Sequence, residues 1–309
     1  MFFTALARFS MTASRRSFLK QLSGLVLGTG SLSVLNSLAA APSTALVPAL
    51  FIGHGSPMNA LENNPFTLAW DAMADNLARL PRPRAILCVS AHWQTPTSTV
   101  SVAARPSTIY DFYGFPGVLY MRQYRAMGVP ESQQWLQQAT TQAIGADGDR
   151  GLDHGAWVVL SRLFPRADVP VFQLSLGQDL DFDGHYQLAA QLALLRRRGV
   201  MVIGSGNMVH NLRSAQEDDL YGTRDQVHGW AQELDQRLLS AIDAQDHLRL
   251  RHLPITEPRL FAQGHPTAEH FLPLLYPLAM QDKQDELHYF AKGFAPGSIS
   301  MTSLLLMPA

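Results

Sequence analysis

Short apolar runs that alternate with segments of helical spacing constrain the fold of this chain more than any other feature. They predict strands over 45–52, 84–89, 98–103, 169–176, 200–203 and 298–307. Helical spacing predicts helices over 66–80, 130–144, 156–164, 184–198, 230–244 and 269–280. Strands that alternate with helices pair in parallel, and the crossover helices cover both faces of the sheet. We therefore predict an α/β fold: a single domain with a central, mostly parallel sheet and helices on both faces.

The first 41 residues have the pattern of an export signal rather than of a folded domain. Ser14-Arg15-Arg16-Ser17-Phe18-Leu19-Lys20 resembles a twin-arginine signal, and Ala39-Ala40-Ala41 offers a cleavage zone. The apolar stretch between them is too rich in Gly and Ser for a stable membrane span. We expect the twin-arginine export machinery to carry a folded domain, residues 45–309, to the periplasm. A cytoplasmic protein with a chance Arg pair is the alternative.

The composition excludes several classes of protein. Hydrophobic residues make up 47% and charged residues 16% of the 309 residues, which suits a chain with a buried core. The formal net charge is −1, and the basic run Arg196-Arg197-Arg198 closes a predicted helix, where cations complement the helix dipole. We therefore expect no nucleic-acid partner. The single cysteine, Cys88, lies in an apolar run, which favours a core position over a metal thiolate.

Three histidines stand just beyond predicted strands. His54 follows the strand over 45–52, His92 follows the strand over 84–89, and His210 follows the strand over 200–203. Ligands of open α/β sheets gather beyond the carboxyl ends of the strands, so we expect these side chains to converge. Glycines beside His54 and before His210 allow sharp turns and close approach of a ligand.

A second group of candidate ligands opens the helix predicted over 269–280. His265-Pro266-Thr267-Ala268-Glu269-His270 offers two imidazoles and a carboxylate within a short segment. Imidazole suits both Zn²⁺ and Fe²⁺, and two histidines with a carboxylate and open positions suit oxygen-activating iron. We therefore predict one divalent metal per chain, either Zn²⁺ or Fe²⁺.

These histidines belong to longer motifs that follow one another from about residue 48 to the C terminus. The motifs are Gly53-His54-Gly55-Ser56-Pro57, Ser90-Ala91-His92-Trp93, Asp111-Phe112-Tyr113-Gly114-Phe115-Pro116, Leu152-Asp153-His154-Gly155-Ala156-Trp157, Gly204-Ser205-Gly206-Asn207 with His210-Asn211, and His265-Pro266-Thr267-Ala268-Glu269-His270. In identity and order they resemble the 4,5-DOPA extradiol dioxygenase family. That family belongs to the class III, protocatechuate 4,5-dioxygenase-like, ring-cleaving enzymes.

The resemblance implies a metal-dependent enzyme that opens a catechol-type ring with O₂, next to the hydroxyls rather than between them. His54 and His92 match metal ligands, and His270 matches the last ligand, for which Glu269 and His265 are alternatives. His210 matches a strand-end histidine that is either a ligand in the absence of substrate or a catalytic base. His154 matches a second active-site histidine beside the substrate. The predicted metal set is His54, His92, His210 and His270, and the predicted catalytic pair is His210 and His154.

Two other functions need many of the same residues. A zinc hydrolase would use metal-bound water as its nucleophile and would consume no O₂. A metal- or ligand-binding protein of the same fold has less need of proton-transfer residues such as His154 and His210. The aromatic loop Tyr110–Phe115 either walls the substrate pocket or packs as a surface loop. Candidate substrate contacts are Tyr120, Arg122 and Trp157.

Overall fold

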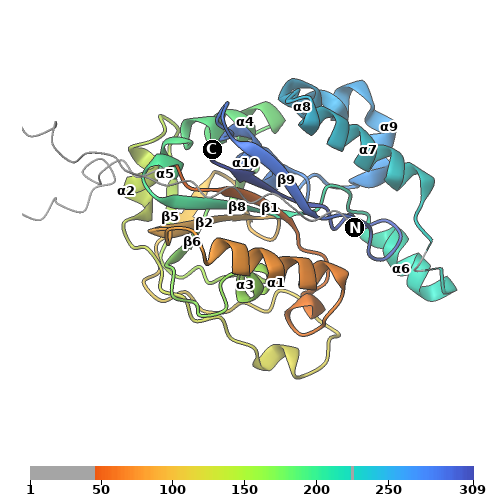
Figure 1. Cartoon of the computed structure of the whole chain (residues 1–309), viewed down its shortest axis with the longest axis horizontal. Helices are drawn as coiled ribbons and strands as arrows, with labels where there is room; N and C mark the ends of the chain where they lie inside the picture. Colours follow the sequence, from red (N-terminus) through yellow and green to blue (C-terminus); the bar gives the residue numbers. More distant parts are fainter. Residues whose placement is uncertain (1–45, 224–225) are drawn as a thin grey trace, which may run out of the picture. The chain divides into compact units, whose positions relative to one another are not determined.

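The computed structural model describes residues 46–223 and 226–309, so the predicted export signal at 1–41 lies outside the described residues. A six-stranded sheet of order β6-β2-β8-β1-β10-β9 forms the centre of this part (Figure 1). Its parallel strands are β6 (Val171–Gln173), β2 (Ala85–Ser90), β8 (Val200–Gly206) and β1 (Ala49–Gly53). Antiparallel strands β10 (Ser303–Met307) and β9 (Glu286–Ala291) complete one edge. The predicted α/β class and mostly parallel sheet are confirmed.

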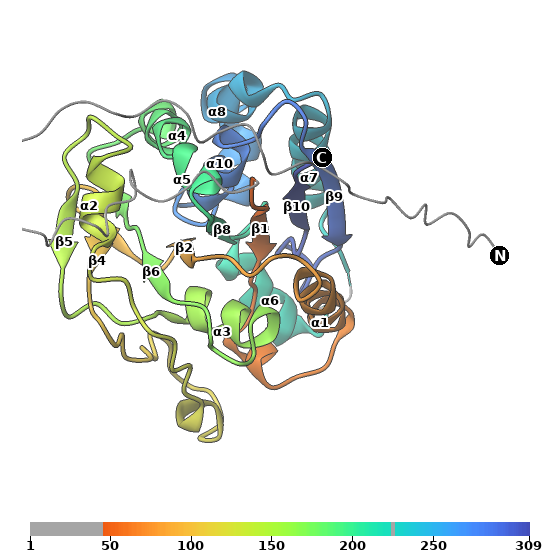
Figure 2. The same cartoon turned by 60° about the vertical axis from the view of Figure 1, so that its left-hand side comes forward.

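Helices pack on both faces of this sheet, as predicted (Figure 2). Helices α1 (Pro65–Leu77) and α3 (His154–Leu163) lie on one face, and α4 (Phe182–Gln191) and α10 (Leu272–Ala279) lie on the other. In the part of the chain that the structure describes, no helix combines the length and apolarity that a membrane crossing requires.

Side chains of the parallel strands alternate between two cores, one on each face of the sheet. Phe51 and Val202 belong to the core that contains α4 and α10, whereas Ile52, Ile203 and Cys88 belong to the core that contains α1 and α3. All five are fully buried, because both faces are covered by helices. The predicted core position of Cys88 is therefore confirmed.

Helix α3 begins at His154 because Asp153 caps it. Asp153 Oδ1 accepts hydrogen bonds from the Ala156 N–H (3.1 Å) and from the Ser90 hydroxyl at the end of β2 (2.7 Å). Its Oδ2 accepts a hydrogen bond from Gln173 Nε2 of β6 (2.7 Å). This buried carboxylate ties the start of α3 to two strand ends, and so fixes His154 beside the edge of the sheet.

The structure corrects several predicted boundaries. The helix predicted over 130–144 spans only α2 (Ser132–Gln137), and the chain then turns into the short strand β5 (Gly145–Asp147). The Thr140 hydroxyl donates a hydrogen bond to the Gln191 side chain. This bond stabilises the turn, where a longer helix would have made a further backbone hydrogen bond. Other corrected segments are 184–198, which forms α4 and then α5 (Leu194–Arg197), 169–176, which forms β6 and then β7 (Leu176–Gly177), 298–307, whose strand begins at Ser303, and 269–280, whose helix begins at Leu272.

The remaining elements lie mostly at the edges of the fold. The predicted segments 98–103 and 230–244 correspond to β4 (Thr99–Ser101) and α7 (Gly229–Asp243). The other elements that were not predicted are η2 (Pro57–Ala60), β3 (Gln94–Thr95), η3 (Leu119–Met121), β9, α6 (Leu212–Tyr221), α8 (His247–Thr256) and α9 (Pro258–Gly264). Of these, α9 carries the chain back to the carboxyl end of β8, where the segment 265–271 begins.

Arg196 lies in the last turn of α5, where the sequence predicted a cation that complements the helix dipole, and it has a further role that the sequence did not indicate. It is fully buried and pairs with the buried carboxylate of Asp285, with Nη2 3.0 Å from Oδ1. Its remaining donors reach the carbonyl oxygens of Val47 (2.8 Å) and Met280 (2.7 Å). The guanidinium therefore joins the chain just before β1 to the end of α10 and the turn before β9.

Candidate metal centre

Three histidines meet beyond the carboxyl edge of the parallel strands. Strand β8 lies between β1 and β2 and is parallel to both. The segments that follow β1 and β2 therefore begin at the same edge of the sheet, with only β8 between them. The Nε2 atoms of His54 and His92 are 3.1 Å apart. A nitrogen of His270 completes a group whose ligand atoms all lie within 4.8 Å of one another. A tetrahedral metal with bonds of about 2.0–2.1 Å separates its ligand nitrogens by about 3.4 Å, so this donor set fits a single ion.

The hydrogen bond of Ser205 fixes the tautomer of His54. The Ser205 hydroxyl donates its one proton to the Gly155 carbonyl oxygen. Its oxygen lies 3.0 Å from His54 Nδ1, and it can only accept there. The proton of the neutral His54 ring is therefore on Nδ1, and the Nε2 lone pair faces His92.

Glu269 orients His270 instead of joining the ligand group. Its carboxylate lies 3.0 Å from His270 Nδ1 and also accepts a hydrogen bond from the Thr267 hydroxyl (2.9 Å). This leaves Nε2 as the nitrogen of His270 that can bind a metal. His265 is engaged elsewhere, since its Nε2 lies 2.8 Å from the Met208 carbonyl oxygen. The geometry therefore favours His270 over both alternatives.

A glycine on β8 lets the segment that carries His270 lie directly against the sheet. The Asn207 N–H donates to the His270 carbonyl oxygen at 2.9 Å. A Cβ atom at Gly206 would lie 2.1 Å from that same oxygen, far inside van der Waals contact. Close backbone approach therefore explains why glycine stands here.

His210 and His154 lie beside the ligand group in different ways. The His210 ring stacks on His270, with centroids 3.5 Å apart and planes 3° apart. It belongs to neither group of ligand atoms that lie within 4.8 Å, so the structure does not bring His210 into the predicted metal set. His154 lies against His92 (centroids 3.8 Å apart) and shares a second such group with His92 and Asp111. The catalytic roles of His210 and His154 stay predictions.

Burial keeps the rings of this cluster neutral. Desolvation, reinforced by the neighbouring histidines, lowers the pKa of His54 and of His270 well below the ordinary value of 6.5. Burial is also the main cause that lowers the pKa of His92 to about 4 and that of His210 to about 3. Neutral imidazole is the form that binds a divalent metal, so at pH 7 the site need not release ring protons to take up an ion.

Asp111 remains ionised close to these rings. Burial raises its pKa, but the close His154 ring, the backbone hydrogen bond from the His154 N–H and the nearby His92 ring outweigh burial and lower the pKa of Asp111 to about 2. Ser205, Asp111 and Glu269 thus supply polar groups around the histidines. The sequence placed all three within motifs, but it offered no indication of which ring each one contacts.

The aromatic loop is partly a wall of the site and partly surface. Phe112 lies edge-on to His154, with centroids 5.6 Å apart, and packs against the rings of Tyr110 (6.1 Å) and Tyr120 (5.2 Å). In contrast, 91% of Tyr113 is exposed. Phe112 therefore borders the histidine cluster and Tyr113 lies at the surface, and a role of the loop as a wall of the substrate pocket stays a prediction.

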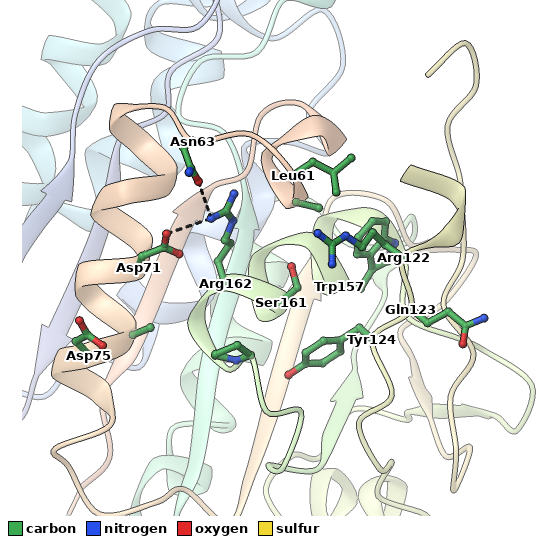
Figure 3. Close-up of a pocket in the computed structure, with 13 residues that line it drawn as sticks. Leu61, Asn63, Asp71, Asp75, Arg122, Gln123, Tyr124, Trp157, Ser161 and Arg162 are labelled. Atoms are coloured by element: carbon green, nitrogen blue, oxygen red, sulfur yellow. Dashed lines mark hydrogen bonds and ion pairs between the residues drawn. The ribbon is translucent and has the colours of Figure 1, made fainter. Parts of the chain in front are cut away.

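A cavity of about 550 Å³ lies along α3, and its lining includes Arg122 and Trp157 but none of the clustered histidines (Figure 3). Arg162 projects from α3 within it and bonds to Asp71 and Asn63. Trp157 lines this cavity, and its ring also lies toward Phe112, with ring centroids 6.4 Å apart. Arg122 thus lines a cavity that does not include the metal centre.

Comparison with known proteins places this arrangement in a family. Residues 47–297 match the family model described as the catalytic LigB subunit of aromatic ring-opening dioxygenase. The 4,5-DOPA dioxygenase extradiol of Escherichia coli K12 is 37% identical over 268 residues, which cover 85% of this chain and 95% of that protein. The protein of the same name from Beta vulgaris is 37% identical over 229 residues, covering 72% and 83%. A crystal structure of an uncharacterized Escherichia coli K12 protein, 33% identical, superposes with a TM-score of 0.69 over 84% of this chain and 99% of that one.

Proposed function

Because this chain belongs to the LigB family of aromatic ring-opening dioxygenases, we propose that it is a metal-dependent extradiol dioxygenase acting on a catechol-type diol. The observation that carries the proposal is the convergence of three neutral imidazoles, from His54, His92 and His270, at one edge of the sheet. Fe²⁺ and Zn²⁺ both accept such nitrogen donors. We favour Fe²⁺, because opening a ring with O₂ requires redox chemistry that Zn²⁺ does not provide.

A metal held by these histidines would supply Lewis acidity toward the diol oxygens and, as iron, the redox chemistry with O₂. The protein would supply the proton acceptors. His210 is neutral at pH 7, because burial lowers its pKa to about 3, and it lies against a ligand ring. We assign the first diol proton to His210. We assign to His154, under the edge of Phe112, the hydrogen bond that orients the substrate.

Anaerobic loading with Fe²⁺ tests the proposal. L-DOPA, caffeate or protocatechuate is then added with O₂, and we expect O₂ uptake together with a yellow ring-opened product. A zinc hydrolase would consume no O₂. If a broad panel of catechols gives neither uptake nor product, the dioxygenase proposal is refuted.

Substitution of the ligands provides an independent measurement. We expect His54→Ala and His92→Ala each to lose bound metal by elemental analysis. His288→Ala is the matched control, since His288 is an exposed histidine on the edge strand β9. Retention of metal by both ligand variants would remove His54 and His92 from the site.

We also propose that the domain is exported in folded form, on the basis of the arginine pair Arg15-Arg16 and the segment that follows it. The iron would then be loaded before export. Cell fractionation tests this: the mature protein should lie in the periplasm and begin near residue 42. A protein found only in the cytoplasm with its first residues intact would refute export.

A further inference from the structure

Asp111 lies between two histidines of the site. Its Oδ2 atom is 3.0 Å from His154 Nδ1 and 3.5 Å from His92 Nδ1. The two rings lie together, with centroids 3.8 Å apart. The contact with His154 is close but is not aligned as a hydrogen bond. The carboxylate therefore acts on both rings mainly through its charge and its position.

The loop that carries Asp111 is attached to the same helix as His154. The Ile109 N–H donates to the Leu152 carbonyl oxygen (2.8 Å), and Trp157 Nε1 donates to the Ile109 carbonyl oxygen (2.9 Å). Asp111 Oδ1 itself accepts a hydrogen bond from the backbone N–H of His154 (2.8 Å). These bonds, two at Ile109 and one at Asp111 itself, fix the carboxylate relative to α3.

The other two ligand histidines each have a polar partner at Nδ1. His54 has the Ser205 hydroxyl and His270 has the Glu269 carboxylate, both at 3.0 Å. Such partners set the tautomer of a ligand histidine and turn its other nitrogen toward the metal. The third ligand, His92, has the carboxylate described above on its Nδ1 side, and its Nε2 faces His54.

We propose that Asp111 is a positioning residue of the metal centre: it keeps the proton of His92 on Nδ1 and holds the ring of His154 beside it. This role concerns metal binding, so it rests on the proposed function only for the reaction that the bound metal serves. The site would then have one such partner for each ligand imidazole. Loss of such a partner typically weakens metal binding 10- to 100-fold, so Asp111 should contribute on that scale.

A purely structural role for Asp111 makes a different prediction. Oδ1 also satisfies the N–H of His154 at the start of α3. Asn at this position keeps that acceptor but loses the negative charge, whereas Glu keeps the charge but displaces it by one methylene. If Asp111 positions the rings by its charge, metal affinity should be highest with Asp, intermediate with Glu and lowest with Asn. A capping role predicts equal affinity for Asp and Asn and the lowest for Glu.

The experiment measures Zn²⁺ and Co²⁺ binding by competition with a chromophoric chelator. We expect Asp111→Asn to bind both ions 10- to 100-fold more weakly, Asp111→Glu to lie between it and the wild type, and the visible Co²⁺ spectrum of Asp111→Asn to change. The control is Asp149→Asn, an equal change of charge at an exposed aspartate, which should bind as the wild type does. Affinity of Asp111→Asn within about threefold of the wild type would overturn the proposal.

Folding and function are followed separately. Far-UV circular dichroism and melting of the metal-free proteins verify that each variant folds, and Asp111→Ser, which keeps an acceptor but no charge, replaces any Asn variant that does not. A protein that shows the affinity order Asp, Glu, Asn but opens no diol supports the role of Asp111 and refutes the dioxygenase proposal. A protein that opens diols with equal affinities in all variants refutes the role of Asp111 alone.

Discussion

Replacing Ser205 with alanine should weaken metal binding while the fold is retained. Ser205 is fully buried on β8, where its oxygen accepts the Nδ1 proton of His54 and its hydroxyl donates to Gly155. Alanine removes that acceptor. His54 must then either keep a buried Nδ1–H without a partner or move its proton to Nε2, and the second form has no lone pair at Nε2, the nitrogen that faces the metal site.

The two alternatives for His54 cost similar amounts of free energy. A buried donor without a partner costs about 1–3 kcal/mol. Outer partners of ligand histidines are worth about 10- to 100-fold in metal affinity, which corresponds to about 1.4–2.7 kcal/mol. We therefore expect the Kd of Ser205→Ala for Zn²⁺ to rise about 10- to 100-fold. The free energy of unfolding of the metal-free protein should fall by about 1–3 kcal/mol.

Competition with a chelating dye measures the first quantity, and urea unfolding of the metal-free protein measures the second. Ser132→Ala is the matched control, because Ser132 is also a fully buried serine and donates to the Ser101 carbonyl oxygen, outside the metal centre. The control should lose stability but keep its Zn²⁺ affinity. Equal Zn²⁺ affinity in Ser205→Ala and the wild type would refute the assignment of the His54 proton to Nδ1.

Three further perturbations test other parts of the structure. Asp285→Ala leaves the buried guanidinium of Arg196 unpaired, so urea titration should show a loss of about 3–5 kcal/mol; a loss below about 1 kcal/mol would contradict burial of the pair. Gly206→Ala places a Cβ 2.1 Å from the His270 carbonyl oxygen, so equilibrium dialysis should show weaker metal binding, and unchanged binding would mean that this segment can move aside. Burial lowers the pKa of His185 to about 4, so between about pH 6.5 and pH 4 the unfolded chain binds more protons than the folded one. The metal-free protein should therefore lose stability as pH falls through that window, by up to about 3 kcal/mol from this group, and a melting profile that His185→Gln does not flatten would contradict the assignment.

The strands that hold the site could be predicted because helices cover both faces of the sheet. Burial on two sides makes β1, β2 and β8 nearly continuous apolar runs, and the residues just beyond such runs must lie at the carboxyl edge. His54 and His92 were found in this way. The order of the strands could not be found, since β8 follows β2 in the chain but lies between β1 and β2 in the sheet.

Elements at the periphery left weaker patterns. Strand β9 is an edge strand whose side chains are mostly exposed or half-buried, so its sequence contains no continuous apolar run. Helix α8 has charged residues on several sides and a proline inside it, so helical spacing does not identify it. In both cases tertiary packing decides a structure that local preference leaves open.

The partners of the histidines could not be predicted because each depends on a contact between distant segments. Asp111 meets the backbone of His154 across 43 residues, and Ser205 meets His54 across 151. The stacking of His210 on His270 depends in the same way on how α9 returns the chain to β8. Sequence spacing carries no information about which of two rings a side chain will face.

The proposed ligands of the metal come from distant parts of the polypeptide, with His54 and His92 near the beginning of the domain and His270 near its end. A ribosome finishes the first two long before it makes the third, so a growing chain can offer an ion only an incomplete set of donors. The full set arises when synthesis is complete and the segment before α10 has docked on β8. Uptake of the ion would then require a finished chain, and a chain that ends before His270 should bind the ion weakly.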